Sequence, residues 1–242
     1  MLHLSKGNAK LSKRLIFSLP AGKTCPGALH CQSFAVVHAN GKRTIQDGKE
    51  TIFRCFAASS EVQYDAVFNN RADNMQQIVD ALKNGTAVDL INNGIQTYRT
   101  KSIKLVRIHE SGDFFSLQYL LAWLEVAKRN PDLKFYAYSK SLDLFVGLNL
   151  PSNFYITASK GGKFDHLLHH FDRYAVVVAD EEEAQSLGLE VDHDDSHCFG
   201  SKPFALLVHS TQPKGSKLGA AIRQRRAKGL HAGYSKKKKV AA

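Results

Sequence analysis

Short apolar runs alternate with helical stretches between Lys101 and Ser210, and this alternation is typical of βα units around a parallel sheet. Each run is rich in β-branched or aromatic residues and has the length of a strand. The strands expected here are Ile103–His109, Lys134–Ser139, Asn153–Ser159, Tyr174–Ala179 and Phe204–His209. The pattern therefore predicts an α/β fold with parallel strands at its centre.

An apolar face at helical spacing lies between the first two of these strands. It predicts a helix over Phe115–Asn130, which Pro131 ends because the residue before a proline avoids the helical conformation. The face consists of Leu117, Leu120, Leu121, Leu124 and Ala127. Further helices are expected over Glu61–Leu82, Val88–Thr97, Leu142–Leu148 and Glu181–Leu187, with Gly85 as a break between the first two.

The N-terminal part has a different pattern. Arg14–Leu19 predicts one more strand. The segment from Pro20 to Cys55 is rich in Gly, Ser, Thr and Asn, so we expect a long structured loop with a hairpin that turns at Asn40-Gly41. Loops of that length inside a compact domain are usually functional or disordered.

Two strand ends repeat a short motif, Ser139-Lys140 and Ser159-Lys160, as expected if equivalent βα turns recur around a barrel. The predicted fold class is therefore α/β, a partial (β/α) barrel with parallel strands, together with a long N-terminal cysteine-bearing loop. The chain has 242 residues and 43% hydrophobic content, enough for a full core. We expect one domain over residues 1–228.

The composition excludes some classes of protein. No run approaches the roughly 20 apolar residues of a membrane helix, and the N-terminus lacks a secretory signal. We therefore expect a cytoplasmic protein with no membrane partner. Thiols stay reduced there, so four cysteines indicate metal ligands more than disulfides, although four unrelated buried thiols remain an alternative.

The formal net charge is +11, which suggests an acidic partner such as nucleic acid. Much of this charge lies near the two ends of the chain, including the run Lys236–Lys239. We expect residues 229–242 to be a basic, disordered tail. The tail either contacts nucleic acid weakly or only aids solubility, because it offers only Tyr234 for base stacking.

The cysteines carry the sharpest chemical signal. Cys25 and Cys31 lie close together in a turn, Cys55 precedes a helix, and Cys198 follows far along the chain. No pair has the short spacing of a zinc knuckle, so zinc is only the alternative metal. A [4Fe–4S] cluster takes four thiolates and tolerates wide spacing, which makes it the predicted cofactor, with all four cysteines as ligands. His30, His38, His193 and His197 lie near the cysteines and could replace a thiolate in a mixed site, but we expect each at the surface or hydrogen-bonded to a ligand.

Polar residues gather where the predicted strands end, which is where chemistry collects in parallel α/β folds. His109, Glu110 and Lys140 are candidate catalytic residues, and Lys160 and His209 are candidates for binding a cofactor. Structural roles are alternatives: Asp113 would cap the helix that begins near Phe114, and Glu110 would pair with Lys140. Asp192 to His197 is interpreted as a polar loop that delivers Cys198. The chain has no P-loop, GxGxxG turn or GxSxG elbow.

Several motifs together resemble the phage "gene product eighty-eight" family, over most of the chain from Gly7 to Ser216. They are Gly7 to Leu11, Ser18 to Ala28, Cys55-Phe-Ala, His109 to Ser116, Tyr138 to Ser141, and His209 to Ser216. The barrel-like pattern also looks like that of radical SAM enzymes. Those enzymes use three cysteines in a CxxxCxxC run and leave one iron free for SAM, whereas here the spacing is wider and a fourth cysteine exists.

Three hypotheses follow from the residues and the resemblance. In the first, all four cysteines cap one cluster with a redox or structural role, which disfavours SAM and implies an electron donor or acceptor protein. In the second, Cys25, Cys31 and Cys55 hold a cluster with an open iron, as the radical SAM resemblance implies, in an enzyme. In the third, a structural metal supports a nucleic-acid-binding protein. The sequence leaves the oligomeric state unknown.

Overall fold

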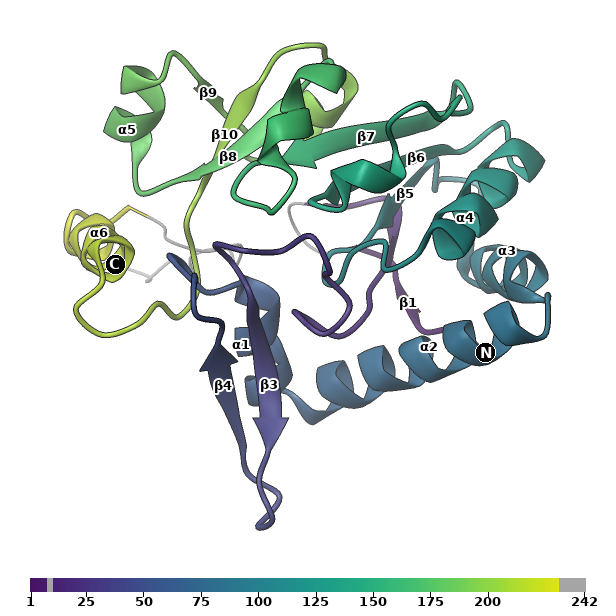
Figure 1. The fold of residues 1–242 in the computed structure, drawn as a ribbon, viewed down its shortest axis with the longest axis horizontal. Helices are drawn as coiled ribbons and strands as arrows, with labels where there is room; N and C mark the ends of the chain where they lie inside the picture. Colours follow the sequence, from purple (N-terminus) through teal and green to yellow (C-terminus); the bar gives the residue numbers. More distant parts are fainter. Residues whose placement is uncertain (8–10, 231–242) are drawn as a thin grey trace, which may run out of the picture.

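An eight-stranded sheet organises the chain in the computed structural model, which describes residues 1–7 and 11–230 (Figure 1). The strand order is β1-β2-β5-β6-β7-β8-β10-β9. Within the described residues, β1 pairs antiparallel with β2, and the other pairs of this sheet are parallel. The strands are β1 Leu4–Ser5, β2 Arg14–Phe17, β5 Leu105–Ile108, β6 Lys134–Ser139, β7 Phe154–Ser159, β8 Tyr174–Val178, β9 Glu190–Val191 and β10 Phe204–Leu207.

The six central strands are β2, β5, β6, β7, β8 and β10, and they lie side by side in the order in which they occur along the chain. Because crossovers between parallel strands share one hand, this order places successive connections on one face of the sheet. The prediction of an α/β fold with parallel strands is confirmed. The sheet is open, with β1 and β9 at its edges, and no closed barrel is present among the described strands.

The two faces of the sheet are filled differently, because successive side chains of a strand point to opposite faces. Val106 and Ile108 pack into the largest apolar core, with Trp123 of α4 and Ile95 of α3. Arg107 points to the other face, with aromatic side chains from β6. The helices are α1 Phe56–Gln63, α2 Asp65–Lys83, α3 Ala87–Tyr98, α4 Leu117–Arg129, α5 Glu181–Ser186 and α6 Lys217–Ala227, with 3-10 helices η1 Leu142–Leu144, η2 Asp165–His170 and η3 Ser196–Phe199.

Two helix predictions need correction. Glu61–Leu82 was expected as one helix, but the chain is extended at Tyr64 (φ −124°, ψ 117°) and forms α1 and α2 on either side of it. The helix expected over Leu142–Leu148 is only the short η1, and Gly147 with φ 78° is incompatible with its continuation. The sequence pattern did not indicate η2, η3, β9 or α6.

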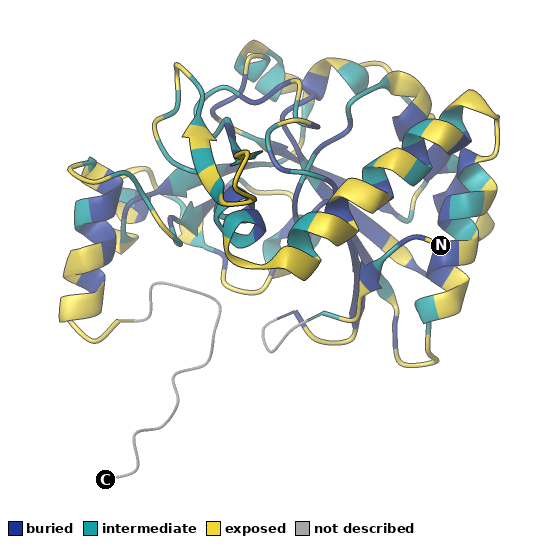
Figure 2. Cartoon of the chain, turned by 90° about the horizontal axis from the view of Figure 1, so that it is seen from below, coloured by how far each residue is buried: buried dark blue, intermediate teal, exposed yellow. Residues whose placement is uncertain are grey.

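The cysteine-bearing segment contains a hairpin of β3 Ser33–Val37 and β4 Arg43–Asp47, which projects from the body of the molecule (Figure 1). Gly41 at its tip has φ 77°, a conformation that glycine adopts without strain, so the predicted turn at Asn40-Gly41 is confirmed. Figure 2 shows exposed residues along this hairpin and along the outer sides of the helices.

The basic tail was predicted to be disordered over residues 229–242. Of these, the structure describes only Gly229 and Leu230, and residues 231–242 lie outside the described part of the chain. No helix in residues 1–7 or 11–230 is long and apolar enough to span a membrane.

Candidate functional site

The loop that carries Cys25 and Cys31 lies across the carboxyl ends of the central strands. The amide of Leu19 donates to the carbonyl of Ser111 after β5 (2.8 Å), and that of His30 donates to the carbonyl of Gly161 after β7 (3.0 Å). Gly27 packs so closely on the end of β6 that an added Cβ would lie 2.1 Å from the Lys140 carbonyl oxygen. The fit of the loop therefore requires glycine at this position.

Cys25, Cys31 and Cys55, which we call the thiol rim, line one cavity of about 180 Å³ at this edge of the sheet. All three are partly exposed. Burial of the sulfur and the charges of neighbouring groups, other thiols among them, raise the pKa of Cys25 and, to about 12, that of Cys55. Burial also raises the pKa of Cys31, although nearby Lys140 opposes this. The three thiols are therefore close enough for their charges to interact, and burial favours the protonated form of each.

Backbone groups also reach these sulfurs. Cys55 is the N-cap residue of α1, and the nearby backbone of Ala57 and Ala58 lowers its pKa, against the effect of burial. A backbone hydrogen bond from Gly22 does the same for Cys25. Amides at a helix N-terminus stabilise negative charge on a thiolate. In the part of the chain that the structure describes, however, no three His, Cys, Asp or Glu side chains are arranged to hold a metal ion.

Cys198 lies apart from the thiol rim. It is fully buried in η3. Burial, then the charge of Asp195, raises its pKa to about 12, and the neighbouring hydroxyl groups of Tyr138 and Thr157 oppose this rise. It does not line the cavity that the other three cysteines share. The structure thus brings together three of the four predicted ligands.

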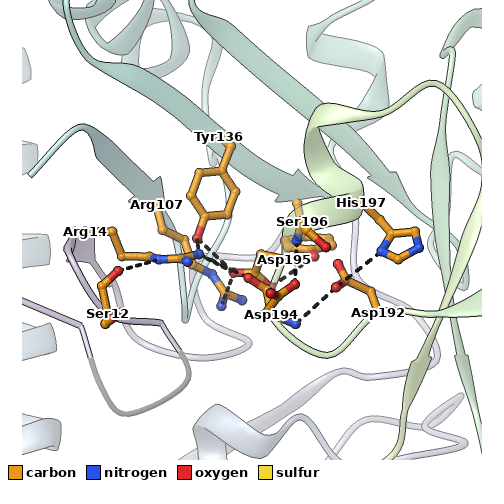
Figure 3. Close-up of polar contacts among 10 residues, drawn as sticks. Ser12, Arg14, Arg107, Tyr136, Asp192, Asp194, Asp195, Ser196 and His197 are labelled. Atoms are coloured by element: carbon orange, nitrogen blue, oxygen red, sulfur yellow. Dashed lines mark hydrogen bonds and ion pairs between the residues drawn. The ribbon is translucent and has the colours of Figure 1, made fainter.

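The loop before Cys198 was expected to bring that cysteine to the site, but it is Asp195 of this loop that lines the cavity. Asp195 packs on the face of the sheet opposite the main core, beside Arg14, Arg107 and Tyr136 (Figure 3). Its carboxylate accepts from Arg107 Nη1 (2.9 Å), Tyr136 OH (2.8 Å) and Tyr138 OH (3.2 Å), and lies 3.6 Å from Arg14 Nη1. We call these five residues the Asp195 network. A buried charge is stable only with such partners. Arg107, Tyr138 and Asp195 line the same cavity as the thiol rim.

Burial of Asp195 was not predicted from the sequence, although one feature of the sequence indicated a buried acidic residue. Arg14 and Arg107 lie within otherwise apolar strands, and both are 8% exposed. Two arginines buried inside a sheet require an acidic partner. The cluster of aspartates before Cys198 was a suitable source of that partner.

His109 is buried at the end of β5, where it has φ 66°, which is rare for a residue other than glycine. Its Nε2 lies 2.9 Å from Tyr119 OH, and its ring packs on Phe17 and Phe114. Burial lowers its pKa to about 3, so the imidazole is neutral. His109 lines the cavity with the thiol rim.

Glu110 and Asp113 have other partners than expected. The Glu110 carboxylate lies 3.7 Å from Arg71 Nη2, so the alternative that it pairs with Lys140 is wrong. Asp113 does not cap α4, because Ser116 is its N-cap residue. Asp113 instead accepts from Ser139 Oγ (2.6 Å) and from the Lys140 amide (2.8 Å), which joins the ends of β5 and β6.

The two strand-end lysines also differ. Lys140 is buried, and its Nζ donates to Ser159 Oγ (2.8 Å) and to the Lys160 carbonyl (2.6 Å) beside the thiol rim. Lys160 is exposed and lines a separate pocket with His30 and Asp165, so it does not reach the shared cavity. His209 does line the shared cavity, with its ring centre 4.8 Å from that of Phe56.

These features define a class: a mixed α/β protein with a mostly parallel sheet, whose cysteine-bearing loop covers the carboxyl edge beside a cavity. Residues 2–229 match the family described as Gene product 88, so the chain belongs to that family, and the resemblance to it is confirmed. The chain is also similar to the Gene 88 protein of Mycobacterium phage L5, at 36% identity over 91 residues. That alignment covers 36% of this chain and spans only 38% of the relative. No solved structure matches the chain.

Proposed function

We propose that the chain is a phage-type iron–sulfur protein in which Cys25, Cys31 and Cys55 hold one [4Fe–4S] cluster at the carboxyl edge of the sheet. The observation that carries the proposal is the convergence of these three thiols, from two separate parts of the chain, on one cavity. Their raised pKa values make them poor thiolates on their own. A cationic iron core would supply the missing stabilisation.

The donor set also favours a cluster over a single zinc ion. Zinc draws four ligands into a small tetrahedron with bonds of about 2.3 Å to sulfur. The described residues contain no group arranged in that way. A cubane places its ligand sulfurs farther apart, because iron and sulfide atoms lie between them. Three cysteines that line one cavity, but form no group arranged to hold a single ion, are therefore more compatible with the larger core.

A cluster with three cysteine ligands would have one iron open to the cavity, in line with the second hypothesis from the sequence. The order of the central strands supports the finer fold proposal, a partial (β/α) barrel of the radical SAM type. SAM is the ligand that this resemblance implies. His109, Glu110 and Lys140 line the cavity and would surround such a ligand, whereas Lys160 would not. The electron donor or acceptor protein stays a prediction.

The test is iron, sulfide and zinc analysis of protein purified without oxygen, for the wild type, Cys55→Ala and Cys198→Ala. We expect about four irons and four sulfides per chain in the wild type and in Cys198→Ala, and loss of most of both in Cys55→Ala. Zinc without sulfide would overturn the cluster. Loss of the cluster in Cys198→Ala, with folding intact, would restore the four-cysteine reading.

A separate measurement tests whether SAM binds to the proposed cluster. The electron paramagnetic resonance spectrum of the reduced wild-type cluster should change when SAM is added, because a ligand on the open iron alters its electronic environment. Cys198→Ala should show the same change. An unchanged spectrum at saturating SAM would remove SAM and leave the redox or structural role.

A further inference from the structure

Helix α6 packs firmly against the body of the protein through its apolar side. Leu218, Ala221 and Ile222 form a buried cluster with Ala179 and Val208, which flank the ends of β8 and β10. On the same side of the helix, Arg225 Nη2 lies 3.1 Å from Glu181 Oε1 of α5. The apolar face of α6 is therefore already covered, and its orientation is fixed.

The outer side of α6 is basic. The helix has no acidic residue, and its exposed cations are Lys217, Arg223 and Arg226, with Lys214 and Lys228 just beyond its ends. Arg223 and Arg226 are neighbours on the helix surface, because residues three apart lie on adjacent turns. In Figure 2 this helix, which precedes the grey C-terminal trace, shows its exposed residues on the outer side.

Few of these charges are neutralised within the protein. Lys217 Nζ lies 3.8 Å from Glu183 Oε1, whereas Arg223, Arg226 and Lys228 make no ion pair with any described residue. The residues outside the described part contain no Asp or Glu in the sequence. A rigid surface with unneutralised arginines attracts a polyanion.

We propose that the outer side of α6 binds the phosphate backbone of nucleic acid. Guanidinium groups suit phosphate because they offer paired donors in one plane. A membrane surface fits less well, because a helix that lies on lipid inserts its apolar side, and that side of α6 is buried against the protein. This site is a folded surface and is distinct from the basic tail that the sequence indicated.

The position of α6 relates this surface to the thiol rim. Phe53, two residues before Cys55, packs on the buried cluster beneath α6. Gln212, in the connection from β10 to α6, accepts from the Arg54 amide (2.8 Å) and donates to the Arg54 carbonyl (3.1 Å). The side of α6 opposite the proposed nucleic-acid surface is therefore packed against the segment that positions Cys55. The proposed binding does not depend on a cluster being present.

The test is fluorescence anisotropy with labelled single-stranded DNA, duplex DNA and RNA of one length. All proteins carry Gln at Lys236–Lys239, so that the tail does not dominate. The test variant is Lys217→Gln/Arg223→Gln/Arg226→Gln. The matched control is Lys83→Gln/Lys101→Gln/Lys128→Gln, which removes three exposed charges elsewhere on the protein. Thermal unfolding of each variant checks that the fold is retained.

We expect the α6 variant to lose about tenfold or more in affinity, and its slope of log affinity against log salt to fall by about 2 to 3, as three lost phosphate contacts require. The control should change far less. Equal weakening in both variants, or no binding once the tail lysines are replaced, would overturn the proposal. The proposal would also be overturned if the α6 variant bound phosphatidylserine vesicles more weakly but bound nucleic acid as tightly as before.

Discussion

The thiol rim and Cys198 differ although they share a residue type and a predicted role. Both are protonated thiols with raised pKa values, and burial is the first cause in each. The rim cysteines are partly exposed residues, come from two segments and line a cavity. Cys198 is closed off among Tyr138, Thr157 and the Asp195 network. A raised thiol pKa alone therefore does not identify a ligand, and accessibility to a shared space separates the two.

The largest expected effect concerns the stability that the Asp195 network provides. Asp195→Asn keeps the size of the side chain and tolerates the φ of 66° at this position, but it leaves Arg107 and Arg14 buried without their carboxylate. We expect a loss of about 3–5 kcal/mol in the free energy of unfolding, measured with urea. Asp194→Asn, at the exposed neighbour, should cost less than about 1 kcal/mol.

Comparison with the rim sharpens this prediction. Cys55→Ser in the metal-free protein should change the free energy of unfolding by less than about 1 kcal/mol, because Cys55 is a partly exposed residue and the substitution changes a single atom. If Asp195→Asn and Cys55→Ser destabilise the metal-free protein equally, the distinction between a structural network and a binding rim fails.

An intermediate effect is expected from acid, through His109. Its pKa is about 3 in the folded protein and 6.5 when unfolded, so the unfolded chain binds an extra proton between these values. The contribution of this group to the free energy of unfolding is fully present above pH 6.5, where the imidazole is neutral in both states. It is lost as the pH falls towards 3. We expect about 2 kcal/mol less stability at pH 5 than at pH 7 from this group alone.

The measurement is urea unfolding of the wild type and His109→Gln at both pH values. The variant should lose less stability than the wild type on acidification, by roughly that same 2 kcal/mol. His3, which is exposed near Asp73, offers a matched control. An identical pH response in His109→Gln and His3→Gln would contradict the assignment of a buried, neutral imidazole.

Local sequence patterns predicted those parts of the fold that are determined by residues close together in the sequence. β6 was predicted with its exact bounds, Lys134–Ser139, since its aromatic content and its flanking residues lie within one short segment. The hairpin turn at Asn40-Gly41 followed from the demand of that turn for positive φ. The break at Tyr64 could not be predicted, because no glycine or proline marks it.

The site was predictable only in part for a similar reason. Strand ends pointed to His109 and Lys140, and both do line the cavity with the thiol rim. Spacing could not decide which cysteines meet, because Cys55 and Cys198 are both far from Cys25 in sequence. The segment that leads into η3 is held against the sheet by the ion pair between Asp195 and Arg107. These two residues are far apart in the sequence, so local patterns do not indicate the contact. That contact separates Cys198 from the rim.

The smallest expected effect is a difference in chemical labelling of the metal-free protein. Brief treatment with iodoacetamide under native conditions should modify Cys25, Cys31 and Cys55 and spare Cys198, which has no exposed surface. Among the rim thiols Cys31 should react first, because Lys140 offsets part of the rise in its pKa, whereas neighbouring charges add to the rise for Cys25. Mass spectrometry of the digested protein measures the extent at each site. Unfolded protein should carry all four labels, and rapid native labelling of Cys198 would mean that η3 opens readily and that the separation of the two regions is not maintained in solution.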